Sequence, residues 1–310
     1  MKNIFITGAT GVLGKRVVKL LLEAGFDVTG LSRSPENTRV LEGLGAKSKH
    51  ASLFNADELI TATRNMDVII HLATAIPNAA IPRKPHHWTL NDKIRIDGTK
   101  ALLKAAGINQ IPRFIQQSIT RIYGNRNGND VDAESPVGEN LPFMLRSAVE
   151  MEKLLRDEGQ LEHVILRFGE FYSADSITTQ QLIKNITKRK MPVIGKGKYF
   201  WNYIHVDDAA RAVMYALQRF EVLKNRTVNF TDFNPIRAKT ALGEVARLTN
   251  SRSPYHMPIF LSRLILSNDL YETITASYKV VQDDIIQDWK PLYNSFPEGM
   301  KKIIEQYHYH

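Results

Sequence analysis

The feature that most constrains this chain is a glycine-rich turn near the start of the sequence. Residues 3–6 (Asn-Ile-Phe-Ile) are a short run of strand-forming residues, and residues 7–14 follow as Thr-Gly-Ala-Thr-Gly-Val-Leu-Gly. Beyond them, Val17, Val18 and the leucines from Leu20 recur at helical spacing. A strand, a glycine turn and a helix in this order predict an anion-binding unit, because the free N–H groups at a helix N-terminus attract negative charge.

The three glycines have distinct expected roles. Gly8 allows the tight turn, Gly11 lets the backbone approach a phosphate, and Gly14 lets the helix pack close to the strand. The spacing is Gly-x-x-Gly-x-x-Gly, and the sequence context favours a bound dinucleotide over a plain turn that happens to be rich in glycine. The residues expected to touch the cofactor here are Gly8, Thr10, Gly11, Val12, Leu13 and Gly14.

The end of the second predicted strand bears on which dinucleotide binds. Residues 26–31 read as this strand, and Ser32-Arg33-Ser34-Pro35 follows it. An acidic residue here would hydrogen-bond the 2′-hydroxyl of NAD, but none is present. Ser32 and Arg33 instead suit a 2′-phosphate, which favours NADP over NAD. The alternative is that Arg33 is a solvated loop residue and that either cofactor binds.

Strands and helices alternate along the first half of the chain. This order predicts an α/β fold of the Rossmann type, a doubly wound parallel sheet with helices on both faces. We expect a dinucleotide-binding domain over residues 1–168 and a smaller mixed domain over 169–310, interwoven with the first near 200–230. Strands are predicted at 44–50, 66–72, 112–118, 163–167, 193–194, 199–206 and 228–230, and helices at 55–65, 88–106, 141–158, 177–190 and 207–219.

Composition limits the chemistry and the partners. The 310 residues include no cysteine, which excludes disulfides and thiolate catalysis, and the pair His86-His87 has no third ligand at helical spacing, so no metal site is predicted. No apolar run is long enough to span a membrane, and we expect a cytoplasmic protein that binds neither membrane nor nucleic acid. The net charge of +9 is scattered, which favours a solvated surface, although attraction of phosphate groups also fits it.

The fourth predicted strand, Met66 to Leu72, is mostly apolar, as is typical of a buried parallel strand. His71 near its end has no partner nearby in sequence and is expected to pack as a structural residue. Ala73 and Thr74 follow and should lie beside the cofactor. The remaining residues expected at the cofactor are Leu53, Leu72, Gln117 and Phe168.

Several motifs occur in one order along nearly the whole chain. Together they resemble the extended short-chain dehydrogenase/reductase superfamily, in its NAD-dependent epimerase/dehydratase group. Arg95 stands where asparagine is usual in that group, and Arg167-Phe168-Gly169 stands where Arg-Pro-Gly is usual. The matching segments are residues 7–14, 67–73, 97–100, 113–124, 201–211, 289–291 and 296–299.

The resemblance implies a catalytic serine or threonine, a tyrosine, and a lysine four residues after the tyrosine that lowers its pKa. The three positions hold Ile119, Met144 and Ala148, and none of the eleven tyrosines has a lysine four residues downstream. No catalytic residue is therefore assigned by the family mechanism. The candidate substitutes for the hydroxyl role are Ser118, Thr120 and Tyr123, of which Tyr123 also fits a packed structural residue.

Two functions remain open. The first is an NADP-binding sensor, regulator or scaffold, or a very weak enzyme. The second is an NADP-dependent oxidoreductase, epimerase or dehydratase with a rearranged site, acting on a nucleotide-sugar or another polar substrate. A phosphate-bearing ligand would explain Arg167, Lys196, Lys198 and Arg211, and so would a solvated surface. The resemblance also suggests a homodimer through the helices near 88–106 and 141–158.

Overall fold

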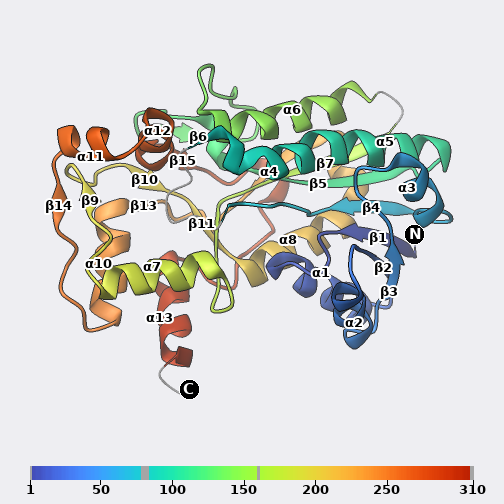
Figure 1. Ribbon diagram of the computed structural model, residues 1–310, viewed down its shortest axis with the longest axis horizontal. Helices are drawn as coiled ribbons and strands as arrows, with labels where there is room; N and C mark the ends of the chain where they lie inside the picture. Colours follow the sequence, from blue (N-terminus) through green and yellow to red (C-terminus); the bar gives the residue numbers. More distant parts are fainter. Residues whose placement is uncertain (1, 78–83, 159–160, 308–310) are drawn as a thin grey trace.

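The centre of the computed structural model, which describes residues 2–77, 84–158 and 161–307, is a parallel sheet of seven strands (Figure 1). Its order is β12-β7-β5-β4-β1-β2-β3, and β1 pairs with both β2 and β4, so the direction of winding reverses there. The predicted doubly wound sheet is confirmed. Its strands are β1 (Asn3–Thr7), β2 (Asp27–Ser32), β3 (Lys47–His50), β4 (Val68–His71), β5 (Arg113–Ile119), β7 (Glu162–Phe168) and β12 (Arg226–Phe230).

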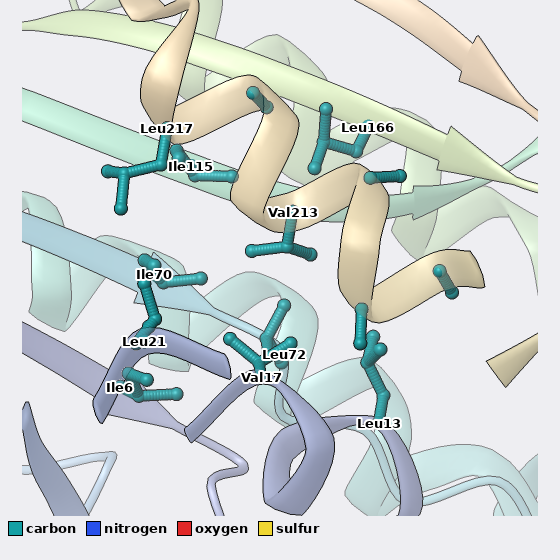
Figure 2. Close-up of a cluster of buried hydrophobic side chains, with 14 of the residues drawn as sticks. Ile6, Leu13, Val17, Leu21, Ile70, Leu72, Ile115, Leu166, Val213 and Leu217 are labelled. Carbon is teal, nitrogen blue, oxygen red and sulfur yellow. The ribbon is translucent and has the colours of Figure 1, made fainter. Parts of the chain in front are cut away.

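Helices cover both faces of the sheet. On one face, α1 (Val12–Glu23) packs against α8 (Val206–Gln218), and Figure 2 shows Val213 and Leu217 of α8 together with Val17 and Leu21 of α1. The buried positions of α8 are mostly alanine and valine, which lets it lie close to its neighbours. The other face carries α3 (Ala56–Ala62), α4 (Thr89–Lys93), α5 (Thr99–Ile108) and α6 (Phe143–Asp157).

The second half of the chain builds a separate apolar core beyond the carboxyl ends of the strands (Figure 1). Helices α7 (Ile177–Thr187), α10 (Ala238–Leu248) and α13 (Phe296–Tyr307) enclose it. Between them the chain returns to the large sheet through α8 and β12. Its other elements are β8 (Glu170–Tyr172), β9 (Val193–Ile194), β10 (Phe200–Trp201), β11 (Tyr203–His205), α9 (Phe220–Leu223), β13 (Ile236–Arg237), β14 (His256–Met257), α11 (Ile259–Ile265), α12 (Asn268–Thr275), β15 (Lys279–Val280) and η4 (Asp284–Ile286).

Several element boundaries differ from the sequence predictions. The helix expected over 88–106 is interrupted by a π-helical turn, η2 (Ile94–Gly98), between α4 and α5, and the strand expected over 199–206 is two short strands. Helix α2 (Pro35–Gly43) was missed, although Ser34 caps it and Pro35 opens it. The elements not yet placed are η1 (Pro85–Trp88), η3 (Thr120–Tyr123) and β6 (Asp130–Val131).

The structure bears on the predicted dimer and on the expectation that the protein does not bind a membrane. Helices α5 and α6 lie side by side on one face of the sheet, as a dimer built on them requires, and the dimer stays a prediction. In the ranges that the structure describes, no helix combines the length and the apolar character needed to cross a bilayer.

Candidate functional site

The glycine turn connects β1 to α1 in a conformation that needs glycine. Gly8 has φ +73°, and a Cβ on it would lie 2.7 Å from the backbone nitrogen of Ala73. A Cβ on Gly14 would lie 2.0 Å from the carbonyl oxygen of Gly8. The amide of Gly11 donates to that same carbonyl at 3.0 Å. Larger residues are therefore excluded from the turn by direct backbone contact.

The N-terminus of α1 is open to an anion. Gly11 provides no side-chain cap, and the first turn of the helix holds no acidic residue. The amide N–H groups of this turn thus have no side-chain acceptor, and the helix dipole adds partial positive charge at the same place. This arrangement fits the pyrophosphate of a dinucleotide.

A cleft of about 460 Å³ opens above this turn, and we call it the cofactor cleft. It lies at the carboxyl ends of β1 and β4, where the sheet reverses, which is where open α/β sheets bind ligands. Twelve of the residues predicted to touch the cofactor line it, namely Gly8, Thr10, Gly11, Val12, Leu13, Gly14, Arg33, Leu53, Leu72, Ala73, Thr74 and Gln117.

The structure places the other two predicted residues elsewhere. Ser32 is fully buried, and its hydroxyl donates to the carbonyl of Ser34 at 2.8 Å. Phe168 is buried beside Phe171 and Phe230 in the core shared with α8. Neither side chain lines the cleft, because the Ser32 hydroxyl is bound to the segment that follows β2 and Phe168 packs in the core.

Arg33 stands exposed at the cleft beside Asn37, and no ion pair involves it among the residues described. Sequence reasoning missed the wall of the cleft contributed by the second half of the chain. Its members are Phe171, Ser176, Ile177, Thr178 and Val206. Only the tertiary fold brings them there, and no local sequence signal marks them.

His71 is a core residue, as the sequence predicts. It is fully buried, and its Nδ1 lies 2.5 Å from the hydroxyl of Thr7. Burial lowers the pKa of His71 to about 4, so the ring is neutral at pH 7. Within the described ranges, no cluster of three or more histidine and acidic side chains is arranged to hold a metal ion.

The three residues that the sequence resemblance aligns with the catalytic positions lie together in one apolar cluster. Met144 and Ala148 lie on the buried face of α6, with 2% and 0% of their surface exposed, and Ile119 packs against them from the end of β5. The other buried members of this cluster are Trp88, Ile122, Leu141 and Leu145. A group that transfers a proton is absent from all three positions.

The three candidate substitutes are also buried, and each hydroxyl is already bound. Ser118 donates to Glu152 Oε1 at 2.6 Å, and the Thr120 hydroxyl lies 3.1 Å from that of Tyr278. Tyr123 is fully buried, where it donates to Asn229 Oδ1 at 2.8 Å. Burial raises the pKa of Tyr123 to about 12, and the nearby guanidinium of Arg167 only partly offsets this. None of the three lines the cofactor cleft.

A buried ion pair holds β7 to α6. Arg167 donates to both carboxylate oxygens of Glu152, at 3.0 and 2.7 Å, and to the Tyr123 hydroxyl at 2.9 Å. Arg211 likewise pairs with the buried Asp208 at 2.9 Å. Two of the cations that a phosphate-bearing ligand would explain are thus paired with carboxylates, and the binding of such a ligand stays a prediction.

Arg95, which replaces the asparagine usual in the family, lies on the π-helical turn and is 4% exposed. Its Nη1 is 3.4 Å from the carbonyl oxygen of Met144 and 3.3 Å from the hydroxyl of Ser147. Burial lowers its pKa to about 10, so it stays a cation at neutral pH. Arg95 therefore links the π-helical turn η2 to helix α6.

The chain is similar in sequence to known reductases and shares its fold with solved proteins. The chain is 26% identical over 315 residues to a 3-diazoavenalumate denitrifying reductase from Streptomyces sp., covering 96% of this chain and 99% of that protein. It is 30% identical over 242 residues to vestitone reductase from Medicago sativa, covering 70% and 73%. The human epimerase family protein SDR39U1, solved with NADPH, shares the fold with a TM-score of 0.79 at 19% identity, covering 98% and 99%.

A family model completes the comparison. The model of the NAD dependent epimerase/dehydratase family matches residues 4–230, which contain the glycine turn, the seven-stranded sheet and α6. The chain therefore belongs to the NAD dependent epimerase/dehydratase family and has its dinucleotide-binding fold.

Proposed function

We propose that this protein binds NADP(H) and does not perform the acid–base chemistry of its family. One observation carries the proposal: Ile119, Met144 and Ala148, which the sequence resemblance aligns with the catalytic positions, lie in or against a buried apolar cluster. A carbonyl or hydroxyl substrate needs a proton donor or acceptor at its oxygen, and an alkyl or thioether side chain supplies neither.

The preference for NADP rests on Arg33. This cation is exposed at the cleft next to the end of β2, and no carboxylate occupies the position that would bind a 2′-hydroxyl. A guanidinium binds phosphate through charge-assisted hydrogen bonds, which are stronger than neutral ones. The 2′-phosphate of NADP would therefore gain an interaction that NAD lacks.

A protein with this site suits a sensor, regulator or scaffold. Without turnover, the bound fraction follows the concentration of the dinucleotide, and binding stabilises the folded state by mass action. The cleft has walls from both halves of the chain, so occupancy would tighten the contact between them. A partner could then distinguish the loaded from the free protein.

A reductase of a different kind is the second candidate, and the full-length similarity to a reductase favours it. Bound NADPH would supply a hydride. Reduction of a carbonyl needs a proton as well, whereas reduction of a cationic or strongly electron-poor acceptor needs the hydride alone. An apolar site without a general acid suits only the latter.

Equilibrium titration with NADPH and NADH, followed by nicotinamide fluorescence, tests the proposal. We expect one site per chain and a lower Kd for NADPH. Gly11→Val should abolish binding, because the added side chain would project into the cleft, and Gly107→Ala, at a site with open space around it, is the matched control. If the wild type binds neither dinucleotide, the proposal is wrong.

A further inference from the structure

A second cavity of about 1170 Å³ shares no lining residue with the cofactor cleft. Its walls are the segment 121–126, the segment 136–142 that leads into α6, the turn 194–199, and helices α11 and α12. In Figure 1 these segments face one another at the end of the molecule that carries the second half of the chain. The volume suits a small organic molecule.

The cavity has a surplus of unpaired positive charge. Arg126, Lys196, Lys198 and Arg263 line it, and within the described chain none of them forms an ion pair. The half-buried Arg126 donates Nη2 to the carbonyl of Pro136, while its buried Nε has no partner in the described structure. The acidic side chains in the lining are Glu139 and Glu272, and Arg121 is neutralised by Glu170.

Backbone hydrogen bonds hold the turn that carries Lys196 and Lys198. The amide of Gly195 donates to the carbonyl of Met257 at 2.8 Å, and the amide of Gly197 donates to that of Ile194 at 3.1 Å. The amide of Lys239 in turn donates to the carbonyl of Gly197 at 3.1 Å. The backbone of the turn that carries Lys196 and Lys198 is thus fixed to β14 and α10, so the turn itself needs no ordering before a ligand binds.

The other component of the lining is apolar. Ile259 and Phe260, the first residues of α11, line the cavity with 50% and 67% of their surfaces exposed. Leu141 and Leu145 line the cavity as well, and they also belong to the apolar cluster that contains Met144 and Ala148. A ligand with an apolar body would cover this surface and release the water on it.

We infer that this cavity binds an anionic small molecule with an apolar body, such as an aromatic or aliphatic carboxylate. The anionic end lies among Lys196, Lys198, Arg126 and Arg263, and the apolar body lies between α11 and the start of α6. Because the apolar cluster that contains Leu141 and Leu145 also contains Met144, the ligand borders the catalytic positions without entering the cofactor cleft. The inference goes beyond NADP(H) binding and does not depend on it.

A pair of fluorescent probes tests the inference. 8-Anilinonaphthalene-1-sulfonate and N-phenyl-1-naphthylamine share one aromatic body, and only the first carries an anionic group. In the double variant K196Q/K198Q, we expect the Kd of the sulfonate probe to rise about tenfold, while that of the neutral probe changes less than twofold. Phe260→Ser should weaken both probes. K188Q/K190Q, which removes two exposed lysines outside the cavity, is the matched control.

Competition identifies the ligand class. Cinnamate should displace the sulfonate probe, and UDP-glucose, which is polar throughout, should not. Displacement by UDP-glucose alone would overturn the inference, as would an unchanged ratio of the two probes in K196Q/K198Q. Displacement of the probe by one equivalent of NADPH would place it in the cofactor cleft and would also overturn it. NADPH affinity should be the same in K196Q/K198Q and the wild type, so the two proposals fail separately.

Discussion

Arg16 of α1 binds Asp175 through two parallel hydrogen bonds, from Nη1 at 3.0 Å and from Nη2 at 2.9 Å. Its Nε donates to Asp207 at the start of α8. Asp175 immediately precedes the segment Ser176–Thr178, which belongs to the far wall of the cofactor cleft. Helix α1, whose N-terminus we propose to bind the cofactor phosphates, is therefore tied directly to the segment on the far side of the cleft.

This contact predicts a role for Arg16 in retaining the cofactor. Arg16→Gln should raise the Kd for NADPH about three- to tenfold, because the bidentate pair that holds the far wall is lost. Stopped-flow dissociation should show the change mainly in the off-rate. Lys19→Gln, on the same helix and in an exposed pair with Glu23 at 3.9 Å, should leave the rate unchanged. Equal off-rates in both variants would contradict this role.

Arg33 is predicted to decide between the two dinucleotides. A hydrogen bond to a charged group contributes about 1.5–3 kcal/mol, so Arg33→Gln should weaken NADPH about 10- to 100-fold. NADH affinity should change less than twofold. Arg39→Gln, an exposed cation on the neighbouring α2, is the control and should affect neither. Equal losses for NADPH and NADH in Arg33→Gln would show that Arg33 is no phosphate ligand.

The buried pair of Glu152 and Arg167 is predicted to stabilise the fold. Glu152→Gln leaves the Arg167 guanidinium buried without its counter-charge, which should cost about 3–5 kcal/mol in urea unfolding. Glu162→Gln, at the start of the same strand in an exposed pair with Lys224, should cost less than about 1 kcal/mol. A loss in Glu152→Gln no larger than that of the control would contradict the prediction.

The same carboxylate should contribute to acid sensitivity. Burial tends to raise the pKa of Glu152, but the hydrogen bond and charge of Arg167 outweigh it and hold the pKa below its ordinary value of 4.5. A depressed pKa stabilises the fold above the unfolded value, and this contribution is lost as the pH falls through the folded value. The wild type should therefore lose more stability than Glu152→Gln below about pH 4.5.

Asp232 should have the opposite pH dependence. It is 5% exposed, its Oδ2 lacks a hydrogen-bond partner in the described structure, and burial raises its pKa to about 8. Between the unfolded pKa near 3.8 and about 8, the folded state holds a proton that the unfolded state has released. Unfolding free energy should therefore fall with rising pH in this window, by up to about 1.4 kcal/mol per unit.

Asp232→Asn tests this sign. The amide does not ionise, so the variant should lack that decline and should gain stability relative to the wild type as the pH rises from 5 to 8. Urea unfolding at a series of pH values measures the difference. A difference between the two proteins that is constant with pH would contradict the assignment to Asp232.

The parts of the fold that depend on local patterns could be predicted from the sequence. The glycine turn and the apolar run of β4 are continuous in sequence, and their chemistry specifies a parallel sheet with an anion site at the reversal of winding. The missed helix α2 also had a local signal in Ser34 and Pro35. The apolar face of α2 is too short to show helical spacing in the sequence, since only Leu41 is buried.

The parts that depend on side-chain partners could not be predicted. Whether Arg167 would bind a phosphate or a carboxylate depends on Glu152, which only the packing of α6 against β7 brings within reach. The burial of Phe168 follows from the direction of its side chain at the strand end. Similarly, Ser176 and Thr178 reach the cofactor cleft through tertiary folding alone, so the far wall was absent from the sequence prediction.

The most direct test of the central claim is a single-turnover experiment. The protein is loaded with one equivalent of NADPH and mixed with a panel of aldehydes and ketones, and the absorbance of the reduced nicotinamide is followed over hours. The account predicts full binding and no carbonyl-dependent decay, because no proton donor reaches the site. Decay that grows with carbonyl concentration and disappears in Ser118→Ala, Thr120→Val or Tyr123→Phe would contradict it.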